Sequence, residues 1–312
     1  MFKVNAGSGS AVSGGKEKLS SNVDKIVWQK SSELSAPPLS ELAGMDKVKA
    51  QFDKFVKLVN IDNQSPDLFR KGAGKSKRFS FVLEGPSGTG KTFIAESLAK
   101  SLDADMVSIN ASDILSKYVG EAESGFSAAC EAIIKHAEVN PKKQIVVFFD
   151  ELEGLFRSRT AEGGSEHNSR MVNTILQELD KLKKQNKATN NITVIGTTNV
   201  YNNLDTAVQT RLKNPIYIGL PDKDTIAKVL EYQLDKAQNL EIPKGTFDYT
   251  KYGEILTSEA AKSKQINMRD LENIAEKYEN FLRLNKNNTH NVSKLTEIVN
   301  DYLASKIVEK AV

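Results

Sequence analysis

The sequence of 312 residues predicts an α/β fold, namely a parallel five-stranded sheet with helices on both faces, followed by a small all-helical domain. Three observations predict this fold. Short apolar runs alternate with segments of helical periodicity. The first of these runs leads into a glycine-rich loop of the kind that joins a strand to a helix. No further strand pattern appears after Pro221.

Five runs are expected to be strands because they are mostly rich in β-branched or aromatic residues. They are residues 81–83, 106–109, 145–149, 192–195 and 216–218. Helical periods separate most of them: Phe93, Ile94 and Leu98 form one apolar face, and residues 171–182 carry a longer one. Strands that are continuously apolar between helices indicate a parallel sheet covered on both faces.

The chain divides into three predicted parts. Residues 1–35 are expected to be a flexible tail or linker because Gly7 to Gly15 is mostly Gly and Ser, with Trp28 as a local hydrophobic anchor. Residues 36–221 form the α/β domain. Residues 222–312 form the helical domain, with helices near 222–238, 268–284 and 291–310.

Composition excludes several classes of protein. With 39% hydrophobic and 27% charged residues, the chain is too apolar to be disordered. No apolar run approaches the roughly 20 residues of a membrane helix, so no membrane span is expected, and residues 1–21 lack the pattern of a signal peptide. Cys130 is the only cysteine, which excludes a disulfide framework in this sequence and favours a reducing, cytoplasmic setting.

The net charge of +3 comes from the first 30 residues, which hold five lysines against Glu17 and Asp24. The rest of the chain has equal numbers of basic and acidic residues. A dedicated nucleic-acid binder usually carries a basic excess on its folded part. Nucleic acid is therefore not the expected partner.

Residues 85–92 match the phosphate-binding pattern G-x-x-x-x-G-K-[ST] between an expected strand and an expected helix. The glycines let successive main-chain N–H groups point at one anion at the N-terminus of the helix. Lys91 is expected to reach the β- and γ-phosphates of a nucleotide, and the Thr92 hydroxyl to ligate Mg²⁺. The expected phosphate-binding residues are Gly85, Pro86, Ser87, Gly88, Thr89, Gly90, Lys91 and Thr92.

Two acids, Asp150 and Glu151, follow the strand expected at 145–149. Carboxylates are costly in an apolar core, whereas the carboxyl ends of parallel strands are where ligands bind in open α/β sheets. Asp150 is expected to hold Mg²⁺ with Thr92, and Glu151 to act as general base on the attacking water. The alternative is that both acids merely cap the next helix. Asn199, at the end of the following strand, could orient that water.

These motifs, in this order, resemble those of an AAA+ ATPase of the AAA type proper, and are most similar to the katanin, spastin and ESCRT-disassembling ATPase group. Asp150-Glu151, Thr198-Asn199 and residues 204–207 resemble its Walker B, sensor 1 and second-region-of-homology signatures. The resemblance implies that the backbone around Gly44 frames an adenine and that Pro221-Asp222 leads into a small helical lid. It implies a P-loop sheet, ATP and Mg²⁺ as cofactors, and hydrolysis of ATP to ADP and phosphate.

The resemblance also implies a loop that grips substrate. Lys117, Tyr118 and Val119 resemble the family's first pore loop, in which an aromatic side chain grips an extended polypeptide through its surface area. Without the resemblance, these residues would form only a turn with a half-buried tyrosine. Residues 162–168 stand in the place of the second pore loop, and no gripping residue is assigned there.

Two arginines have places in the family pattern. Arg211 stands where the family has an arginine finger, which reaches the γ-phosphate of a neighbouring subunit and implies an oligomer; the alternative is a surface arginine in a solvated loop. Many relatives carry a second arginine nearby, whereas this chain has Lys213. Arg269 resembles the sensor 2 arginine of other AAA+ ATPases; the alternative is an ion pair with Asp270 or Glu272 in solvent.

The leading interpretation is a Mg-ATP-dependent ring motor that unfolds, disassembles or remodels protein substrates through a central pore. The resemblance implies a homo-oligomer, namely a hexameric ring, whose N-terminal tail or an adaptor recruits the substrate. Two alternatives stay open. One is a nucleic-acid-associated loader or initiator, favoured by Arg269 and the tail lysines. The other is a nucleotide-gated scaffold with little turnover.

Overall fold

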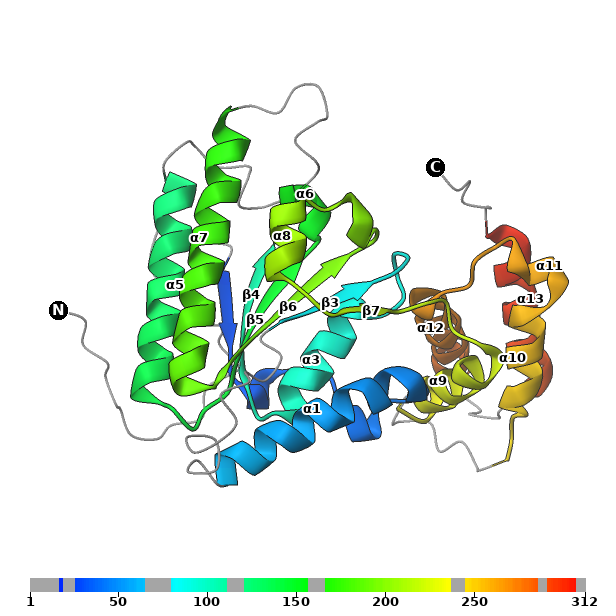
Figure 1. Cartoon of the computed structure of the whole chain (residues 1–312). Coiled ribbons are helices and arrows are strands. Elements are labelled where there is room, and N and C mark those ends of the chain that lie inside the picture. The colour runs from blue at the N-terminus through cyan, green and yellow to red at the C-terminus, as the bar shows by residue number, and fades with distance from the viewer. Residues whose placement is uncertain are drawn as a thin grey trace.

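The computed structural model describes residues 17–18, 26–64, 80–110, 121–156, 166–236, 245–285 and 291–306. One part of the molecule is built around a β-sheet, and a group of helices lies beside it, at the right of Figure 1. None of the described helices combines the length and the apolar character that crossing a membrane requires.

The five predicted strands are present and all run parallel. They are β3 Ser80–Glu84, β4 Asp105–Asn110, β5 Ile145–Asp150, β6 Ile192–Thr198 and β7 Pro215–Tyr217. Their order in the sheet is β4-β5-β6-β3-β7, so β3 pairs with two strands that come later in the chain. The carboxyl ends of β3, β5 and β6 meet at one edge of the sheet, where ligands bind in folds of this kind.

Two further strands extend the sheet beyond β4 and correct the predicted tail. β1 Glu17–Lys18 pairs antiparallel with β2 Ile26–Gln29, which pairs antiparallel with β4. Trp28 packs edge-on against His136 with 4.9 Å between ring centres, as expected of a local anchor, and Leu34 is buried. The predicted tail is therefore wrong from residue 26 onward, because the apolar, β-branched Ile26–Gln29 joins the sheet and Leu34 is buried in a hydrophobic core.

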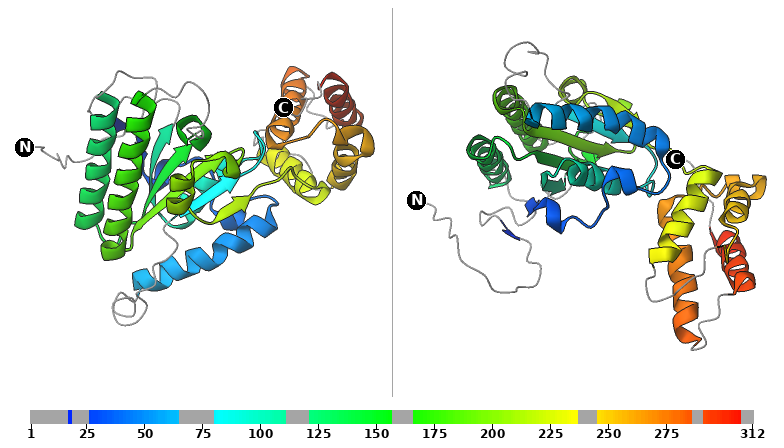
Figure 2. Two further views of the ribbon diagram at one scale, coloured as in Figure 1. Left: turned by 45° about the horizontal axis from the view of Figure 1, so that its top comes forward. Right: turned by 90° about the horizontal axis from the view of Figure 1, so that it is seen from below.

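Helices cover both faces of the sheet, as predicted (Figures 1 and 2). The sheet domain contains α1 Asp46–Gln64, α3 Lys91–Ser101, α5 Glu121–Val139, α6 Leu152–Phe156, α7 Glu166–Thr189 and α8 Thr206–Arg211, with short turns η1 Ser31–Glu33, η2 Leu39–Glu41 and η3 Tyr201–Asn203. α5 and α7 pack on one face, and α1 and α3 pack on the other. Along β5, Val147 and Phe149 enter the first core, whereas Val146 and Phe148 enter the second.

The chain after β7 forms a separate helical core, called the lid domain below. Its helices are α9 Lys223–Lys236, α10 Tyr249–Thr257, α11 Glu259–Lys262, α12 Met268–Leu284 and α13 Val292–Ser305. They enclose the buried side chains of Tyr252 and Tyr278. The described residues of this domain contain no strand, in agreement with the predicted small all-helical domain.

The lid domain contacts the sheet domain around the start of α3. The Met268 N–H donates a hydrogen bond to the Gly88 carbonyl oxygen at 2.9 Å. The Lys228 ammonium of α9 pairs with the Asp46 carboxylate of α1, also at 2.9 Å. The glycine-rich loop therefore lies between the edge of the sheet and the lid.

Candidate nucleotide-binding site

Residues 85–90 join β3 to α3 in a tight bend. At Gly85, where φ is +153°, a Cβ would lie 2.0 Å from the Ile218 carbonyl oxygen, and at Gly88, where φ is +76°, it would lie 2.8 Å from the Asn267 side chain. Both positions therefore need glycine. Within the described part of the chain, the main-chain N–H groups of residues 88–92 donate no hydrogen bond. These free donors at a helix N-terminus fit a phosphate group.

Lys91 begins α3, and its side chain reaches back over the glycine-rich loop. The ammonium group donates to the carbonyl oxygens of Gly85 at 2.7 Å and Pro86 at 2.8 Å, and to the Asn199 side-chain oxygen at 3.1 Å. Burial lowers the pKa of Lys91, and the negative charge of Glu153 is the largest effect that opposes this shift. The cation thus lies among oxygen atoms that phosphate oxygens could replace.

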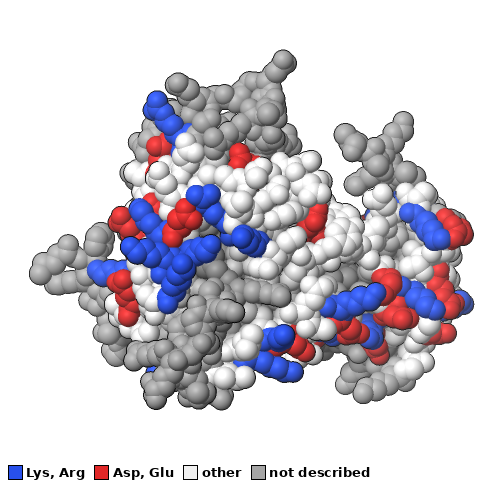
Figure 3. All heavy atoms as spheres, viewed as in Figure 1, with Lys and Arg blue, Asp and Glu red and all other residues white. Residues whose placement is uncertain are grey.

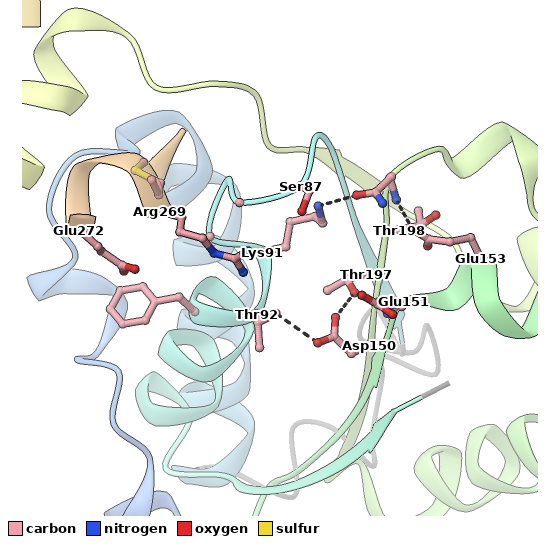
Figure 4. A pocket seen from close by; sticks show the side chains of 15 residues that line it. Ser87, Lys91, Thr92, Asp150, Glu151, Glu153, Thr197, Thr198, Arg269 and Glu272 are labelled. Carbon is pink, nitrogen blue, oxygen red and sulfur yellow. Dashed lines mark hydrogen bonds between the residues drawn. The ribbon is translucent and has the colours of Figure 1, made fainter. Parts of the chain in front are cut away.

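Asp150 ends β5, and two threonine hydroxyls flank its carboxylate (Figure 4). Thr197, on β6, donates to one carboxylate oxygen at 2.5 Å, and the Thr92 hydroxyl lies 3.4 Å from the other. Carboxylate and hydroxyl oxygens are the ligands that Mg²⁺ prefers. Thr92 and Asp150 therefore fit the predicted magnesium site.

Glu151 directly follows β5 with a φ of +56°, which is uncommon for a residue other than glycine. Its main-chain N–H donates to the Thr197 hydroxyl at 3.0 Å, and this bond holds the turn. Its side chain lines the same cleft as Lys91 and Thr92. Strained conformations concentrate at functional sites, and here the strained turn keeps the carboxylate of Glu151 at the cleft.

Asn199 lies just beyond β6 and is held by a residue that sequence reasoning missed. The Asn199 N–H donates to the Glu153 carboxylate at 3.2 Å. The other carboxylate oxygen of Glu153 is buried and has no hydrogen-bond partner among the described residues. Thr197 belongs to the polar run that ends at Asn199, but no role was predicted for it. The signal that could have found Glu153 is a third acid two residues after Glu151, in a helix that begins at the carboxyl end of β5.

A cleft of about 280 Å³ joins these groups to the lid domain (Figure 4). It is lined by Ser87, Gly88, Gly90, Lys91, Thr92, Phe93, Asp150, Glu151, Glu153, Thr197, Thr198, Asn199, Met268, Arg269 and Glu272. Of the predicted phosphate-binding residues, Gly85, Pro86 and Thr89 do not line it. Gly85 and Pro86 accept hydrogen bonds from Lys91, and the buried Thr89 hydroxyl donates to the Pro86 carbonyl oxygen, so these three residues shape the loop.

A smaller, mostly apolar cavity of about 60 Å³ adjoins the cleft. It is lined by Leu42, Ala43, Met45, Gly90, Phe93, Val229, Tyr232, Gln233, Met268 and Glu272. An apolar cavity with a few polar groups suits a nucleotide base. Gly44 is not a lining residue but lies between two that are. Its φ is +66°, and a Cβ there would lie 2.8 Å from a Thr225 methyl carbon, so Gly44 allows the lid to approach.

Arg269 enters the cleft from the lid domain. Its side chain extends from the first turn of α12 toward the start of α3 (Figure 4). Among the described residues it forms no ion pair with Asp270 or Glu272. The arrangement is thus that of a cationic side chain available to a ligand, and its sensor role stays a prediction.

Arg211 lies at the end of α8 and does not line the cleft. Its guanidinium donates to the Asp180 carboxylate of α7 at 2.8 and 3.0 Å, and to the Ala207 carbonyl oxygen at 3.1 Å. Arg211 thus lies on a helix and not in a solvated loop. Its hydrogen bonds hold the guanidinium away from the cleft of its own chain.

The predicted pore-loop residues Lys117, Tyr118 and Val119 lie outside the described residues, as do residues 162–165 of the region assigned to the second pore loop. Their proposed roles remain predictions.

The family of ATPases associated with various cellular activities (AAA) matches residues 81–220. This match spans the glycine-rich loop, Asp150, Glu151, Asn199 and Arg211. The chain carries an AAA ATPase domain. Members of this family bind nucleotide with Mg²⁺, and ATP hydrolysis is their general kind of activity.

Several curated relatives of this AAA ATPase domain are similar over most of the chain. Identity is 30% over 235 residues to Fidgetin-like protein 1 of Drosophila melanogaster, covering 73% of this chain and 42% of that protein. It is 29% over 239 residues to Cell division protein C of Sulfolobus acidocaldarius, covering 73% and 59%. It is 31% over 194 residues to Spastin of Dictyostelium discoideum, covering 62% and 28%. The chain thus spans less than two thirds of the length of each of these relatives.

Proposed function

We propose that this chain is a Mg-ATP-hydrolysing ring motor that unfolds, disassembles or remodels protein substrates by threading them through a central pore. One observation carries the proposal. The cleft holds the free amides of the glycine-rich loop together with Lys91, Asp150, Glu151 and Asn199, whereas Arg211 is fixed elsewhere on the same chain. A second copy is needed to bring an arginine finger to this site.

In the proposed reaction, Glu151 accepts a proton from water as the water oxygen bonds to the γ-phosphorus of ATP, and the bond from that phosphorus to the ADP oxygen breaks. Asn199 orients the water, and Lys91 with the loop amides binds the phosphate oxygens. Thr92 and Asp150 would hold Mg²⁺, which neutralises charge on the phosphates when bound.

Arg211 is proposed to act on the neighbouring subunit. An arginine offers a planar fork of donors that matches phosphate oxygens, and a lysine such as Lys213 is a poor substitute for it. Sites that are completed in trans favour a closed homo-oligomer, and the family resemblance makes six subunits the proposed ring size. We further propose that Tyr118, flanked by Lys117 and Val119, grips the substrate in the pore, and that residues near the N-terminus recruit it through an adaptor.

A subunit-mixing experiment tests the shared site. Lys91→Ala removes phosphate binding, and Arg211→Ala removes the finger, so each variant alone should hydrolyse little ATP. A mixture should regain a fraction of wild-type hydrolysis, because an Arg211→Ala site can receive the finger of a Lys91→Ala neighbour. Lys184→Ala, which removes an exposed cation near the end of α7 and away from the cleft, serves as the control. A mixture no more active than its components would contradict the proposal.

A second experiment tests threading. Tyr118→Ala should abolish ATP-dependent unfolding of a tagged protein while ATP hydrolysis continues, and Tyr118→Phe should keep both activities because the ring provides the contact area. Equal unfolding by wild type and Tyr118→Ala would contradict the pore role.

One observation favours a second candidate function, that of a nucleic-acid loader. The C-terminal half of α7 carries the exposed lysines Lys181, Lys184 and Lys187, and blue side chains gather over this part of the molecule in Figure 3. DNA binding that falls steeply with rising salt would support this alternative. We also propose a cytoplasmic setting, supported by the buried, free thiol of Cys130.

A further inference from the structure

We propose that Asp270 is a positioning residue that couples the end of α13 to the glycine-rich loop, so that the position of Tyr302 and Lys306 sets how Arg269 meets the nucleotide. This role rests on the proposed ATP site. It assigns a function to a buried carboxylate that takes no part in the chemistry.

The first link is a hydrogen-bonded contact between the lid and the loop. Three consecutive lid residues take part. The N–H groups of Met268 and Arg269 approach the Gly88 carbonyl oxygen at 2.9 and 3.4 Å, and the Asn267 side chain lies 3.5 Å from the Ser87 carbonyl oxygen. A Cβ at position 88 would lie 2.8 Å from the Asn267 side chain, which would then have to shift. The first turn of α12 therefore rests directly on the loop that holds phosphate.

The second link is Asp270, which is buried. One of its carboxylate oxygens accepts from the Asn267 main-chain N–H at 2.7 Å, and the Asp270 N–H donates back to the Asn267 side chain at 3.1 Å. This reciprocal pair is a capping box. It fixes both the main chain and the side chain of Asn267, and therefore the contact with the glycine-rich loop.

The third link is the end of α13. The Tyr302 hydroxyl donates to the Asp270 carboxylate at 2.7 Å, and the Lys306 ammonium forms an ion pair with it. The same ammonium donates to the Gln265 carbonyl oxygen at 3.2 Å, and Lys264 donates to the Lys306 carbonyl oxygen at 2.8 Å. The side chains of the ion pair are only 15% and 8% exposed, so water cannot readily replace either partner.

These links form one continuous path. Residues 302–306 hold Asp270, Asp270 holds Asn267, and Asn267 with Met268 holds the glycine-rich loop beside Arg269. Displacing the end of α13 would leave the Asp270 charge without its cation. The first turn of α12 would then shift, and the guanidinium of Arg269 would move relative to the phosphates.

Lys306→Met tests this path because it removes the cation and keeps an unbranched apolar side chain almost as long as that of lysine. Lys294→Met is the matched control, since Lys294 lies on α13, the helix that Lys306 directly follows, and pairs with the more exposed Glu297. Two measurements are made on the full chain: the affinity for a fluorescent ATP analogue, at concentrations too low for assembly, and amide hydrogen exchange without nucleotide.

We expect Lys306→Met to lower the affinity about tenfold, within the range of ordinary coupling between two sites. Exchange at the Met268 amide should quicken about as much, while the Ile274 amide in the middle of α12 keeps its protection. Tyr302→Phe should give a smaller change in the same direction, and Lys294→Met should give none.

Unchanged affinity and unchanged Met268 exchange in Lys306→Met would overturn the coupling. Equal loss of protection at Met268 and Ile274 would also overturn it, because the lid would then simply be unfolding. If wild type binds no ATP analogue, the proposed function fails instead, and the exchange measurement still tests the path because it needs no nucleotide.

Discussion

Two arginines of this chain meet very different surroundings. Arg269 projects from the lid into the cleft and forms no ion pair with the acids next to it in sequence, within the described residues. Arg211 is held by Asp180 and by the Ala207 carbonyl oxygen, outside the cleft. We therefore propose that Arg269 acts on the nucleotide of its own chain, whereas Arg211 is oriented in advance for the nucleotide of a neighbour.

Two charged groups of the cleft already have partners within the chain before nucleotide binds. Lys91 is satisfied by Gly85, Pro86 and Asn199, and Asp150 is satisfied by Thr197. Both groups are therefore already held by other residues of this chain. In the proposed function, the group still to be added is Arg211 of a second chain.

The largest expected effect is on ATP hydrolysis by the assembled protein, which needs Arg211, whereas nucleotide binding by the unassembled chain does not. Arg211→Ala should lower the rate of ATP hydrolysis by about 10³, the lower end of what arginine fingers contribute, and leave the nucleotide affinity of the unassembled chain unchanged. Steady-state hydrolysis and binding of a fluorescent nucleotide check the two parts. Arg283→Ala, which removes an exposed lid arginine paired with Glu279, is the control. A loss of affinity in the Arg211 variant would assign it to its own site.

Arg269→Ala should give the opposite pattern. Loss of a charge-assisted hydrogen bond to phosphate costs roughly 1.5–3 kcal/mol, so the unassembled chain should bind ATP at least tenfold more weakly, with a smaller effect on ADP. Isothermal titration with each nucleotide measures this. Equal affinities for wild type and variant would mean that Arg269 faces solvent.

Asp180→Asn removes the charge that holds Arg211. The pair is partly exposed, so the free energy of unfolding should change by less than about 1 kcal/mol. Hydrolysis in the assembled state should nevertheless fall several-fold, since Arg211 must then be ordered during assembly. Denaturant unfolding and hydrolysis assays report the two quantities. Unchanged hydrolysis would show that the orientation of Arg211 in the free chain does not matter.

The smallest expected effect concerns the ion pair between Lys228 of the lid domain and Asp46 of α1. Hydrogen bonds and charge from Lys49, followed by Lys228, lower the pKa of Asp46 to about 2. A depressed carboxylate pKa contributes stability above pH 3.8, and this contribution is lost as pH falls through about 2. Lys228→Met should raise the Asp46 pKa in an NMR titration but leave it below 3.8, because Lys49 remains. An unshifted pKa would mean that the lid contact is not formed in solution.

The parts of the site that depend on local sequence could be predicted. The glycine-rich loop and the acids after β5 have fixed spacing and flanking elements, and the structure brings Lys91, Thr92, Asp150, Glu151 and Asn199 to one cleft. The five parallel strands followed from apolar runs between helical periods. Both predictions rest on patterns that a few neighbouring residues determine.

The parts that depend on distant pairing could not be predicted. Pairing of β2 with β4 joins residues about eighty positions apart. Because Gly7 to Gly15 is mostly Gly and Ser, the sequence predicted a flexible tail over residues 1–35 instead of a strand. The contact of Glu153 with Asn199 and the ion pair of Asp270 with Lys306 are also long-range. An acid or a lysine at such a position looks in sequence like any solvated charge.

The most direct test of the shared catalytic site is the mass of the Glu151→Gln chain in solution, measured by light scattering with and without Mg-ATP. The substitution removes the proposed base and keeps the phosphate-binding groups, so bound ATP should persist and trap any assembly. A shift from monomer or dimer to about six subunits, abolished by Lys91→Ala in the same chain, is the predicted result. A mass that stays monomeric in saturating Mg-ATP would contradict a site completed by Arg211 of a neighbour.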